Sequence, residues 1–338
     1  IATKFFTCTL SVMYREKTKE GEIFGGPMYV IKNGLPKRML PLAYFFALAG
    51  MIGCLPAFQS NQLIQITGDL AFSGIENFNI FGGLVLAGIT GIVVIGGLKR
   101  IAEVATFLVP LMGSIYFGAM LIALTLNLDQ VFPAFKLILV DAFNGTAIAG
   151  GTFFGVLIYG VRRGAFSNEA GMGTESLVHG VAKVSDPVKQ GLVAMTGPIF
   201  DTLIICTATA LMILISGVWE TSTSQGVTLT AEAFSMLLGN FGGFILFICV
   251  ICFGLSTIFT YSYYGASCSR FLFGKFGMKF YIYLYIFSIF IYSIVPIDIA
   301  INIADGAFAM MAIPTLVSAL WLAPKVMQAS RNYFKLIK

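Results

Sequence analysis

Residues 236–266 read MLLGNFGGFILFICVICFGLSTIFTYSYYGA and contain no Asp, Glu, Lys or Arg. This run exceeds the roughly 20 apolar residues that a helix needs to cross a bilayer. The whole chain has the same character: its 338 residues are 57% hydrophobic and 11% charged, with a mean hydropathy of +0.88. An ordinary soluble domain is about 45–50% apolar and about 25% charged. The composition therefore excludes a cytosolic enzyme, a nucleic-acid-binding protein and a disordered scaffold, and it predicts an all-α polytopic membrane protein.

Apolar runs separated by polar loops predict one transmembrane domain over residues 1–338, with eight complete spans and one partial span. The predicted spans are 1–14 (partial), 40–65, 78–98, 101–126, 146–164, 190–217, 236–266, 278–296 and 298–322. The run 1–14 is too short for a full span and is followed by the charged stretch 15–20. A signal peptide carries its charges before the apolar run. We therefore expect 1–14 to be the end of a membrane helix in a fragment that lacks its N-terminal segment.

Basic residues fall almost entirely on one side of the predicted membrane. When the loop after residue 14 is placed on that side, the opposite side carries Lys136 as its one basic residue. Cytoplasmic loops of membrane proteins are rich in Lys and Arg. The asymmetry predicts that the C-terminus is cytoplasmic. It also explains the net charge of +5 as a consequence of topology, without an acidic or nucleic-acid partner.

Cysteine and histidine give no evidence of a metal or redox centre in the sequence. Cys249 and Cys252 have the spacing of a zinc or redox pair, but they lie in the apolar run 247–253, far in sequence from His179. A zinc ion would need two more ligands. We therefore interpret these cysteines as packing residues, expect His179 to be solvated in a cytoplasmic loop, and predict no cofactor and no metal other than sodium.

Polar groups within predicted spans mark candidate sites, because they are costly in a bilayer. The stretch 145–164 holds six glycines in twenty residues, which makes a poor helix interior. It predicts a discontinuous helix whose free N–H and C=O groups bind a carboxylate or a small cation. Close helix packing through small residues is the alternative.

Two further polar pairs lie in apolar spans. Gln59 and Gln62 share a helix face at the outer part of 40–65, where they either bind a polar ligand or bond to a neighbouring helix. Ser256 and Thr257 offer adjacent hydroxyl oxygens to a sodium ion. The alternative for the hydroxyls is a bond to the carbonyl one turn earlier in the same helix.

Carboxylates also occur within the predicted spans. Asp298, Asn302 and Asp305 share one helix face, and Asp201 lies in 190–217. Such groups either couple ions or protons to transport, or they have structural roles at a helix end or in an interhelical hydrogen bond.

The segment Arg163-Gly-Ala-Phe-Ser-Asn-Glu-Ala-Gly-Met-Gly-Thr174 resembles the signature after the sixth helix of the alanine/glycine:cation symporters, the sodium:alanine symporter family. Other stretches match the same family in the same order. They are Tyr14-Arg-Glu16, Gly25-Gly-Pro-Met-Tyr29, Gln59-Ser-Asn61, Gly197-Pro-Ile-Phe-Asp-Thr202, Ser256-Thr257, Ser262-Tyr-Tyr-Gly265 and Ala312-Ile-Pro314. The resemblance covers essentially the whole chain.

The resemblance implies a LeuT-type five-plus-five inverted-repeat fold whose first and sixth helices are broken at mid-membrane. It maps 1–14 to helix two, 40–65 to helix three, 146–164 to helix six and 236–266 to helix eight. On this mapping helix one and part of helix two are missing, and half of the binding site with them. In helix six the apolar run Val156-Leu-Ile158 replaces a polar or basic residue of many relatives, which leaves the substrate preference open.

The resemblance further implies sodium-coupled uptake of alanine or glycine by alternating access, in a bacterial inner membrane. The implied substrate contacts are Gln59, Gly151, Thr152, Phe153, Phe154 and Gly155, with the two phenylalanines as walls of a small pocket. Ser256 and Thr257 are the implied sodium ligands, and Arg162, Arg163 and Glu169 are candidates for an inner gate, with a solvated charge pair as the alternative.

Other functions were weighed against this one. A proton-coupled amino acid transporter, a passive channel and a non-functional fragment remain open. A membrane-embedded enzyme would need a metal cluster, a nucleophile with a base, or a cofactor motif, and the sequence offers none at ligand spacing. The expected partners are a small amino acid and the lipid bilayer, and the oligomeric state is left open.

Overall fold

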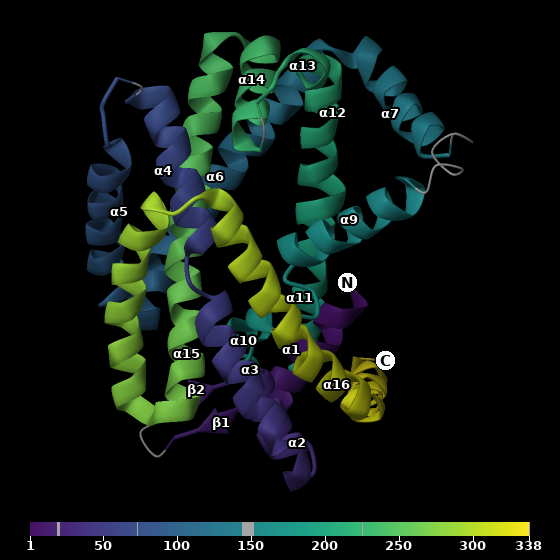
Figure 1. Cartoon of the computed structure of the whole chain (residues 1–338). Helices are drawn as coiled ribbons and strands as arrows, with labels where there is room; N and C mark the ends of the chain where they lie inside the picture. Colours follow the sequence, from purple (N-terminus) through teal and green to yellow (C-terminus); the bar gives the residue numbers. More distant parts are fainter. Residues whose placement is uncertain (19–20, 73, 144–151, 225, 338) are drawn as a thin grey trace.

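The computed structural model describes residues 1–338 apart from 19–20, 73, 144–151, 225 and 338. The described chain is almost entirely helical (Figure 1). Its α-helices are α1 (Ala2–Met13), α2 (Pro27–Gly34), α3 (Leu40–Gly53), α4 (Ala57–Ala71), α5 (Phe78–Val94), α6 (Gly97–Leu126), α7 (Leu128–Ala142), α9 (Thr152–Ser167), α10 (Thr174–His179), α11 (Pro187–Pro198), α12 (Thr207–Ser216), α13 (Val218–Thr221), α14 (Val227–Leu238), α15 (Asn240–Ile294) and α16 (Ile297–Ile337). A 3₁₀ turn (Lys37–Met39) precedes α3, and a π-helical segment, Ile199–Cys206, joins α11 to α12. The strands β1 (Glu16–Lys17) and β2 (Ile23–Phe24) form a small antiparallel hairpin.

Five helical stretches within the described residues are long and apolar enough to cross a membrane. They are Lys37–Asp69, Gly97–Leu126, Pro187–Ser216, Phe241–Ile294 and Ile297–Leu336. The shorter helices α5 and α14 are also apolar. Large apolar side chains are exposed on the outer helix faces, where a soluble protein would carry polar groups. The architecture is that of an all-α membrane protein, as the composition predicts.

Several predicted spans have different bounds in the structure. The span 40–65 is divided into α3 and α4 at residues 54–56, because Pro56 has no N–H for a continuing helix. The spans 236–266 and 278–296 lie in one assigned helix, α15, which is interrupted at Gly274 with a φ of 68°. Residues 236–238 belong to α14, which ends before Gly239. Helix α7 lies outside the predicted spans, between 101–126 and 146–164, and Asp129, Lys136 and Asp141 interrupt its apolar pattern.

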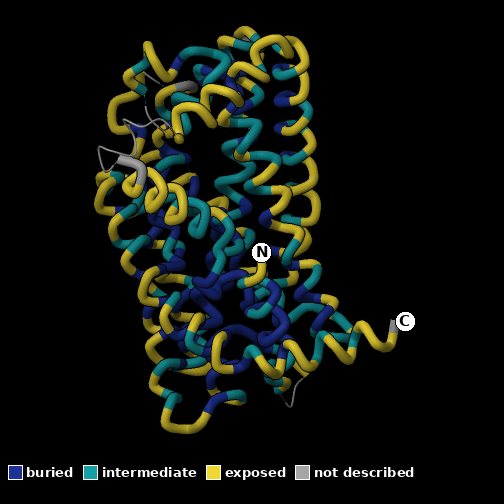
Figure 2. The backbone as a smooth tube through the Cα atoms, turned by 90° about the vertical axis from the view of Figure 1, so that its right-hand side faces the viewer, coloured by how far each residue is buried: buried dark blue, intermediate teal, exposed yellow. Residues whose placement is uncertain are grey.

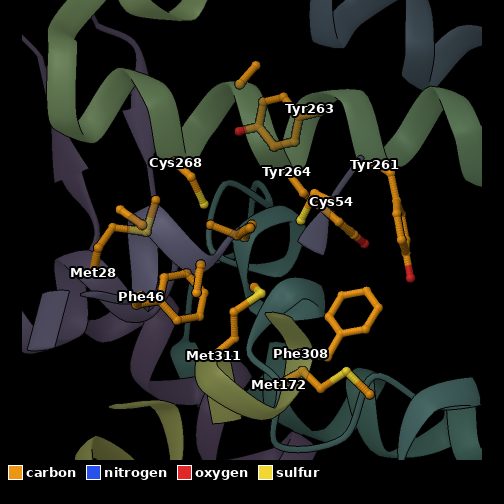
Figure 3. Close-up of a cluster of buried hydrophobic side chains, with 14 of the residues drawn as sticks. Met28, Phe46, Cys54, Met172, Tyr261, Tyr263, Tyr264, Cys268, Phe308 and Met311 are labelled. Atoms are coloured by element: carbon orange, nitrogen blue, oxygen red, sulfur yellow. The ribbon is translucent and has the colours of Figure 1, made fainter. Parts of the chain in front are cut away.

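Buried side chains form two clusters. The larger cluster joins α2, α3, α15 and α16 around Met28, Phe46, Cys268 and Met311 (Figure 3). The smaller one joins α6, α12, α14 and α15. Figure 2 shows the deeply buried chain gathered near the N-terminus, in the lower half of the molecule, and exposed residues along the outer helices.

The segment that carries the family signature is part of the larger cluster. Glu169, Gly171 and Gly173 have φ values of 53°, 85° and 87°, so the chain turns sharply between α9 and α10. Met172 is buried, and its carbonyl oxygen accepts a hydrogen bond from Thr315 Oγ1 at 3.1 Å. The turn of this segment therefore packs against α16.

Candidate functional site

A cavity of about 420 Å³ lies between α4, the C-terminal end of α9, the start of α14 and the middle of α15. Small-molecule sites in proteins typically enclose about 300–1,000 Å³. Polar side chains reach the cavity from three separate parts of the chain. These side chains are Gln59 and Gln62 from α4, Ser167 and Glu169 from the end of α9 and the turn after it, and Thr257 and Tyr261 from α15. Gln59, Glu169 and Thr257, which were predicted as a substrate contact, an inner-gate residue and a sodium ligand, thus line one cavity.

Aromatic rings form much of the remaining wall. Phe58 of α4 meets Phe166 of α9 edge to face, with ring centres 6.3 Å apart. Phe253 and Tyr261 line the cavity from α15. The site therefore combines an apolar wall with a few convergent polar groups, which is the usual composition of a small-molecule site.

Glu169 is the charged group of this cavity, and it lies outside the five long apolar stretches. Its Oε2 accepts a hydrogen bond from Thr174 Oγ1 at 2.8 Å, and the hydroxyls of Tyr261 and Tyr264 also bond to its carboxylate. Burial raises the pKa of Glu169 above its usual range, although these hydrogen bonds and Lys4 act in the opposite direction. An arriving cation would offset the cost of burying this carboxylate.

Glu175 of α10 is a second buried carboxylate near Glu169. Its Oε1 accepts a hydrogen bond from Thr7 Oγ1 at 2.9 Å, whereas its buried Oε2 has no partner in the described structure. Burial, and then the charge of Glu169, raise the pKa of Glu175 to about 7. Glu175 is not among the site residues predicted from the sequence. Its position just after the Gly-Met-Gly turn could have indicated that it is buried. An isolated carboxylate in a predicted loop is, however, normally interpreted as exposed to solvent.

The expected substrate contacts in 151–155 do not line the cavity in its described part. Gly151 lies outside the described residues, and Thr152 and Phe153 begin α9. Phe154 is 65% exposed, and neither it nor Gly155 faces the cavity. In Figure 1 the N-terminal end of α9 points away from α4, and the residues of α9 that line the cavity, Phe166 and Ser167, lie at its C-terminal end.

The predicted helix break falls partly outside the described residues. Helix α9 continues through Gly155, Gly160 and Gly164, so 152–164 is not discontinuous, and 145–151 lies outside the described residues. A sharp turn with positive φ angles follows at 168–173. Glycine lowers helix propensity by about 1 kcal/mol each, a penalty that the surrounding helix tolerates.

The two expected sodium ligands have different surroundings. Both hydroxyls bond to the carbonyl oxygen of Phe253 at 2.9 Å, which is the local alternative considered for them. Thr257 also lines the cavity, whereas Ser256 is buried against Met112 of α6, with Oγ 3.9 Å from Sδ. Since each hydroxyl oxygen keeps a lone pair, Thr257 can still offer an oxygen to a cation in the cavity.

The structure does not bring Glu169 together with the two arginines of the expected inner gate. Arg162 instead forms an ion pair with Asp305 of α16, and Arg163 lies 4.0 Å from the same carboxylate. Asp305 is thus a counter-charge of α9, whereas Asp298 and Asn302 on the same helix are exposed. Asp201 accepts a hydrogen bond from Ser167 Oγ at 2.5 Å, which is the interhelical bond considered for it.

The ion pair of Arg162 with Asp305 should contribute a modest coupling energy. The Arg162 side chain is 55% exposed and that of Asp305 10%, so solvent screens part of the attraction. We expect a double-mutant cycle of Arg162→Gln and Asp305→Asn to give about 1 kcal/mol of coupling in the free energy of unfolding. Arg100→Gln in place of Arg162→Gln is the control and should show none; equal coupling for both arginines would contradict the pairing.

The structure also tests the predictions for the cysteine pair and for His179. Cys249 is buried and its Sγ lies 3.9 Å from the Met112 carbonyl oxygen, in agreement with a packing role. The prediction of a solvated His179 is wrong. His179 is partly buried at the end of α10, and its Nδ1 lies 2.5 Å from Nε2 of Gln190, a residue of α11.

Comparison with known proteins agrees with the resemblance read from the motifs. The sodium:alanine symporter family matches residues 1–338. The chain is 36% identical to the uncharacterized transporter YflA of Bacillus subtilis, over 99% of this chain and 71% of the relative. It is 34% identical to the sodium/alanine symporter AgcS of Methanococcus maripaludis, over 100% of this chain and 75% of the relative. It is 32% identical to a Bacillus subtilis protein named "Probable sodium/glutamine symporter GlnT", over 98% of this chain and 69% of the relative.

These matches bear on the remaining expectations as well. The family match spans the whole chain and lends no support to the expected loss of a first helix. The relatives are transporters and not enzymes. With its apolar helices, its polar cavity and these matches, the chain belongs to the sodium:alanine symporter family of membrane transport proteins.

Proposed function

We propose that the protein takes up a small neutral amino acid, alanine or glycine, together with sodium. The observation that carries this proposal is the cavity that joins Gln59, Glu169 and Thr257. The proposed mechanism is alternating access in a LeuT-type five-plus-five fold. We place the protein in a bacterial inner membrane with its C-terminus in the cytoplasm, in keeping with the distribution of its basic residues.

The lining of the cavity suits a zwitterion. The amide of Gln59 can donate a hydrogen bond to the substrate carboxylate, and the carboxylate of Glu169 offers negative charge to a cation. Phe58, Phe166 and Phe253 restrict the space beside these groups, which favours a small side chain. Residues 151–155 stay in the proposal as contacts made in another state of the transport cycle.

Sodium is the proposed coupling ion. Sodium is a hard cation that favours oxygen ligands, and Thr257 contributes a hydroxyl oxygen at the wall of the cavity. Ser256 faces α6, and its role as a ligand requires a local rearrangement. If sodium binding favours the outward-open state and organises the substrate site, each ligand raises the affinity for the other by the same factor.

Uptake of labelled alanine into proteoliposomes tests the proposal. We expect uptake to require sodium and Thr257→Ala to raise the half-saturating sodium concentration about tenfold, since one lost ligand is worth roughly 1.4 kcal/mol. Thr257→Ser should stay near wild type because it keeps the oxygen. Ser256→Ala is the control at the neighbouring residue. A small change in its half-saturating sodium concentration would place the ion on the side of the helix that faces the cavity. Unchanged uptake when choline replaces sodium would exclude sodium coupling.

A proton-coupled amino acid transporter is the second candidate. The observation in its favour is the nearby pair of buried carboxylates, Glu169 and Glu175, since burial and like charge favour holding a proton. The same proteoliposomes separate the two candidates. Uptake driven by an inward proton gradient in choline medium supports proton coupling, and uptake driven by sodium at equal pH on both sides supports sodium coupling.

A further inference from the structure

A second cavity, of about 380 Å³, lies at the end of the molecule that carries the β1–β2 hairpin. Four basic residues line it: Lys17 of the hairpin, Lys32 of α2, and Arg270 and Lys275 on either side of the Gly274 interruption in α15. Among the described residues, the lining contains one acidic residue, Glu16. None of these residues belongs to the transport cavity.

Part of the basic charge is held in place by ion pairs. Lys32 Nζ lies 2.7 Å from Glu16 Oε1, and Arg270 Nη2 lies 2.7 Å from Glu22 Oε2. The Arg270 guanidinium also lies over the ring of Phe24, 3.8 Å from its centre, and its side chain is only 12% exposed. Lys32 and Arg270 are thus fixed by carboxylates, and basic residues outnumber acidic ones among the described residues that line the cavity.

The cavity opens onto an apolar helix surface. Phe271 lines it and packs against the rings of Tyr29 and Tyr44, with ring centres 5.4 and 5.7 Å away. Tyr44 is 46% exposed, and Leu48, one turn further along α3, is exposed on the same helix face. Tyr44 therefore lies between the basic groups of the cavity and an exposed apolar strip of α3. Tyrosine residues are typical of the bilayer interface.

We propose that this cavity binds the phosphate headgroup of an anionic phospholipid in the cytoplasmic leaflet. Lys17 and Lys32 lie at its rim and would donate to the phosphate oxygens, while Arg270 supplies a fixed positive charge in its wall. The acyl chains would follow the exposed strip of α3 past Tyr44 and Leu48. Basic pockets between membrane helices on the cytoplasmic side bind anionic headgroups in this way. A lipid is favoured over free phosphate because Tyr44, which lines the cavity, begins the exposed apolar strip of α3.

Native mass spectrometry of the full chain tests the proposal. The protein is released from detergent micelles that contain phosphatidylglycerol and phosphatidylcholine in equal amounts. We expect preferential retention of phosphatidylglycerol and at least a tenfold weaker retention in the double variant Lys17→Gln/Lys32→Gln. The double variant Lys99→Gln/Arg100→Gln is the matched control, because it removes the same charge from an exposed corner between α5 and α6 that does not line the cavity. It should change retention less than twofold.

Two outcomes would overturn the lipid site. Equal losses in the two double variants would mean that anionic lipid is attracted only by the general positive charge of this face. Protection against thermal unfolding by inorganic phosphate equal to that by phosphatidylglycerol would mean that the cavity recognises phosphate alone. Tyr44→Ala adds an independent measurement, since it should weaken phosphatidylglycerol retention while it leaves the basic residues in place.

Discussion

The variant Gly25→Val is expected to destabilise the folded protein strongly. A Cβ atom at residue 25 would lie 2.6 Å from the Cα of Gly180 and 2.7 Å from Ser11 Oγ. Ser11 Oγ accepts a hydrogen bond from Gly26 N at 2.6 Å and donates one to the Ser176 carbonyl oxygen at 2.7 Å. The new side chain therefore separates two backbones and breaks the hydroxyl bridge between them. Overpacking costs about 1–3 kcal/mol and each buried hydrogen bond about 1 kcal/mol more, so we expect a loss of about 3–5 kcal/mol.

The loss is measured from the apparent melting temperature in detergent and from the monodisperse fraction on size-exclusion chromatography. Gly113→Val in α6 is the matched control, because nothing lies within 4 Å of a Cβ atom built at residue 113. The control should melt close to the wild type. If both variants melt at the same temperature, the close approach of residues 25 and 180 does not hold α10 in place.

The variant Glu175→Gln is expected to remove most of the pH dependence of stability between about pH 4.5 and pH 7. The folded protein raises the pKa of this carboxyl to about 7, against an ordinary value of 4.5. The folded state thus favours the protonated form. The resulting stability is complete below about pH 4.5 and is lost as the pH rises through about 7. Linkage converts this difference into ~3 kcal/mol at most, and Gln keeps an oxygen for Thr7 without the charge.

Melting temperatures of the two proteins at pH 5.5 and pH 8.5 test this expectation. The wild type should lose stability at pH 8.5, and Glu175→Gln should be the more stable protein there. Glu169, Lys4 and Cys8 surround the group and stay unchanged in the variant. Glu103→Gln, at an exposed position of α6, is the control and should keep the wild-type dependence. An unchanged slope in Glu175→Gln would assign the titration to another group.

Features that depend on neighbours in sequence were predictable. The apolar runs predicted the main helices, and the motif around 163–174 predicted the family. Hydropathy failed where helices are amphipathic, as in α7, and where one proline or glycine divides an apolar run, as at Pro56 and Gly274. The glycines of 155–164 were overrated as helix breakers, because helix propensity is a weak preference that the rest of a helix overrides.

The polar residues that line the cavity can be recognised in the sequence, but their arrangement cannot. Gln59, Glu169 and Thr257 are identifiable as polar groups in or beside apolar segments, yet nothing in their spacing assigns them to one cavity. The partner of Arg162 lies 143 residues away in Asp305, and Thr7 lies 168 residues from Glu175. Such pairs form only when helices pack against each other. Patterns of neighbouring residues in the sequence therefore cannot predict them.

The sequence by itself determined that this protein is a helical membrane protein of the sodium:alanine symporter family, because composition, hydropathy and contiguous motifs are sums over neighbouring residues. Only the tertiary structure decided which polar groups meet. In the folded protein Met172 of the signature segment is buried, and Arg162 of α9 pairs with Asp305 of α16. A second carboxylate, that of Glu175, lies near Glu169. The physical reason is that the ionisation and ligand affinity of a group depend on its burial and on charges within a few ångströms, which in this protein come from helices far apart in the chain.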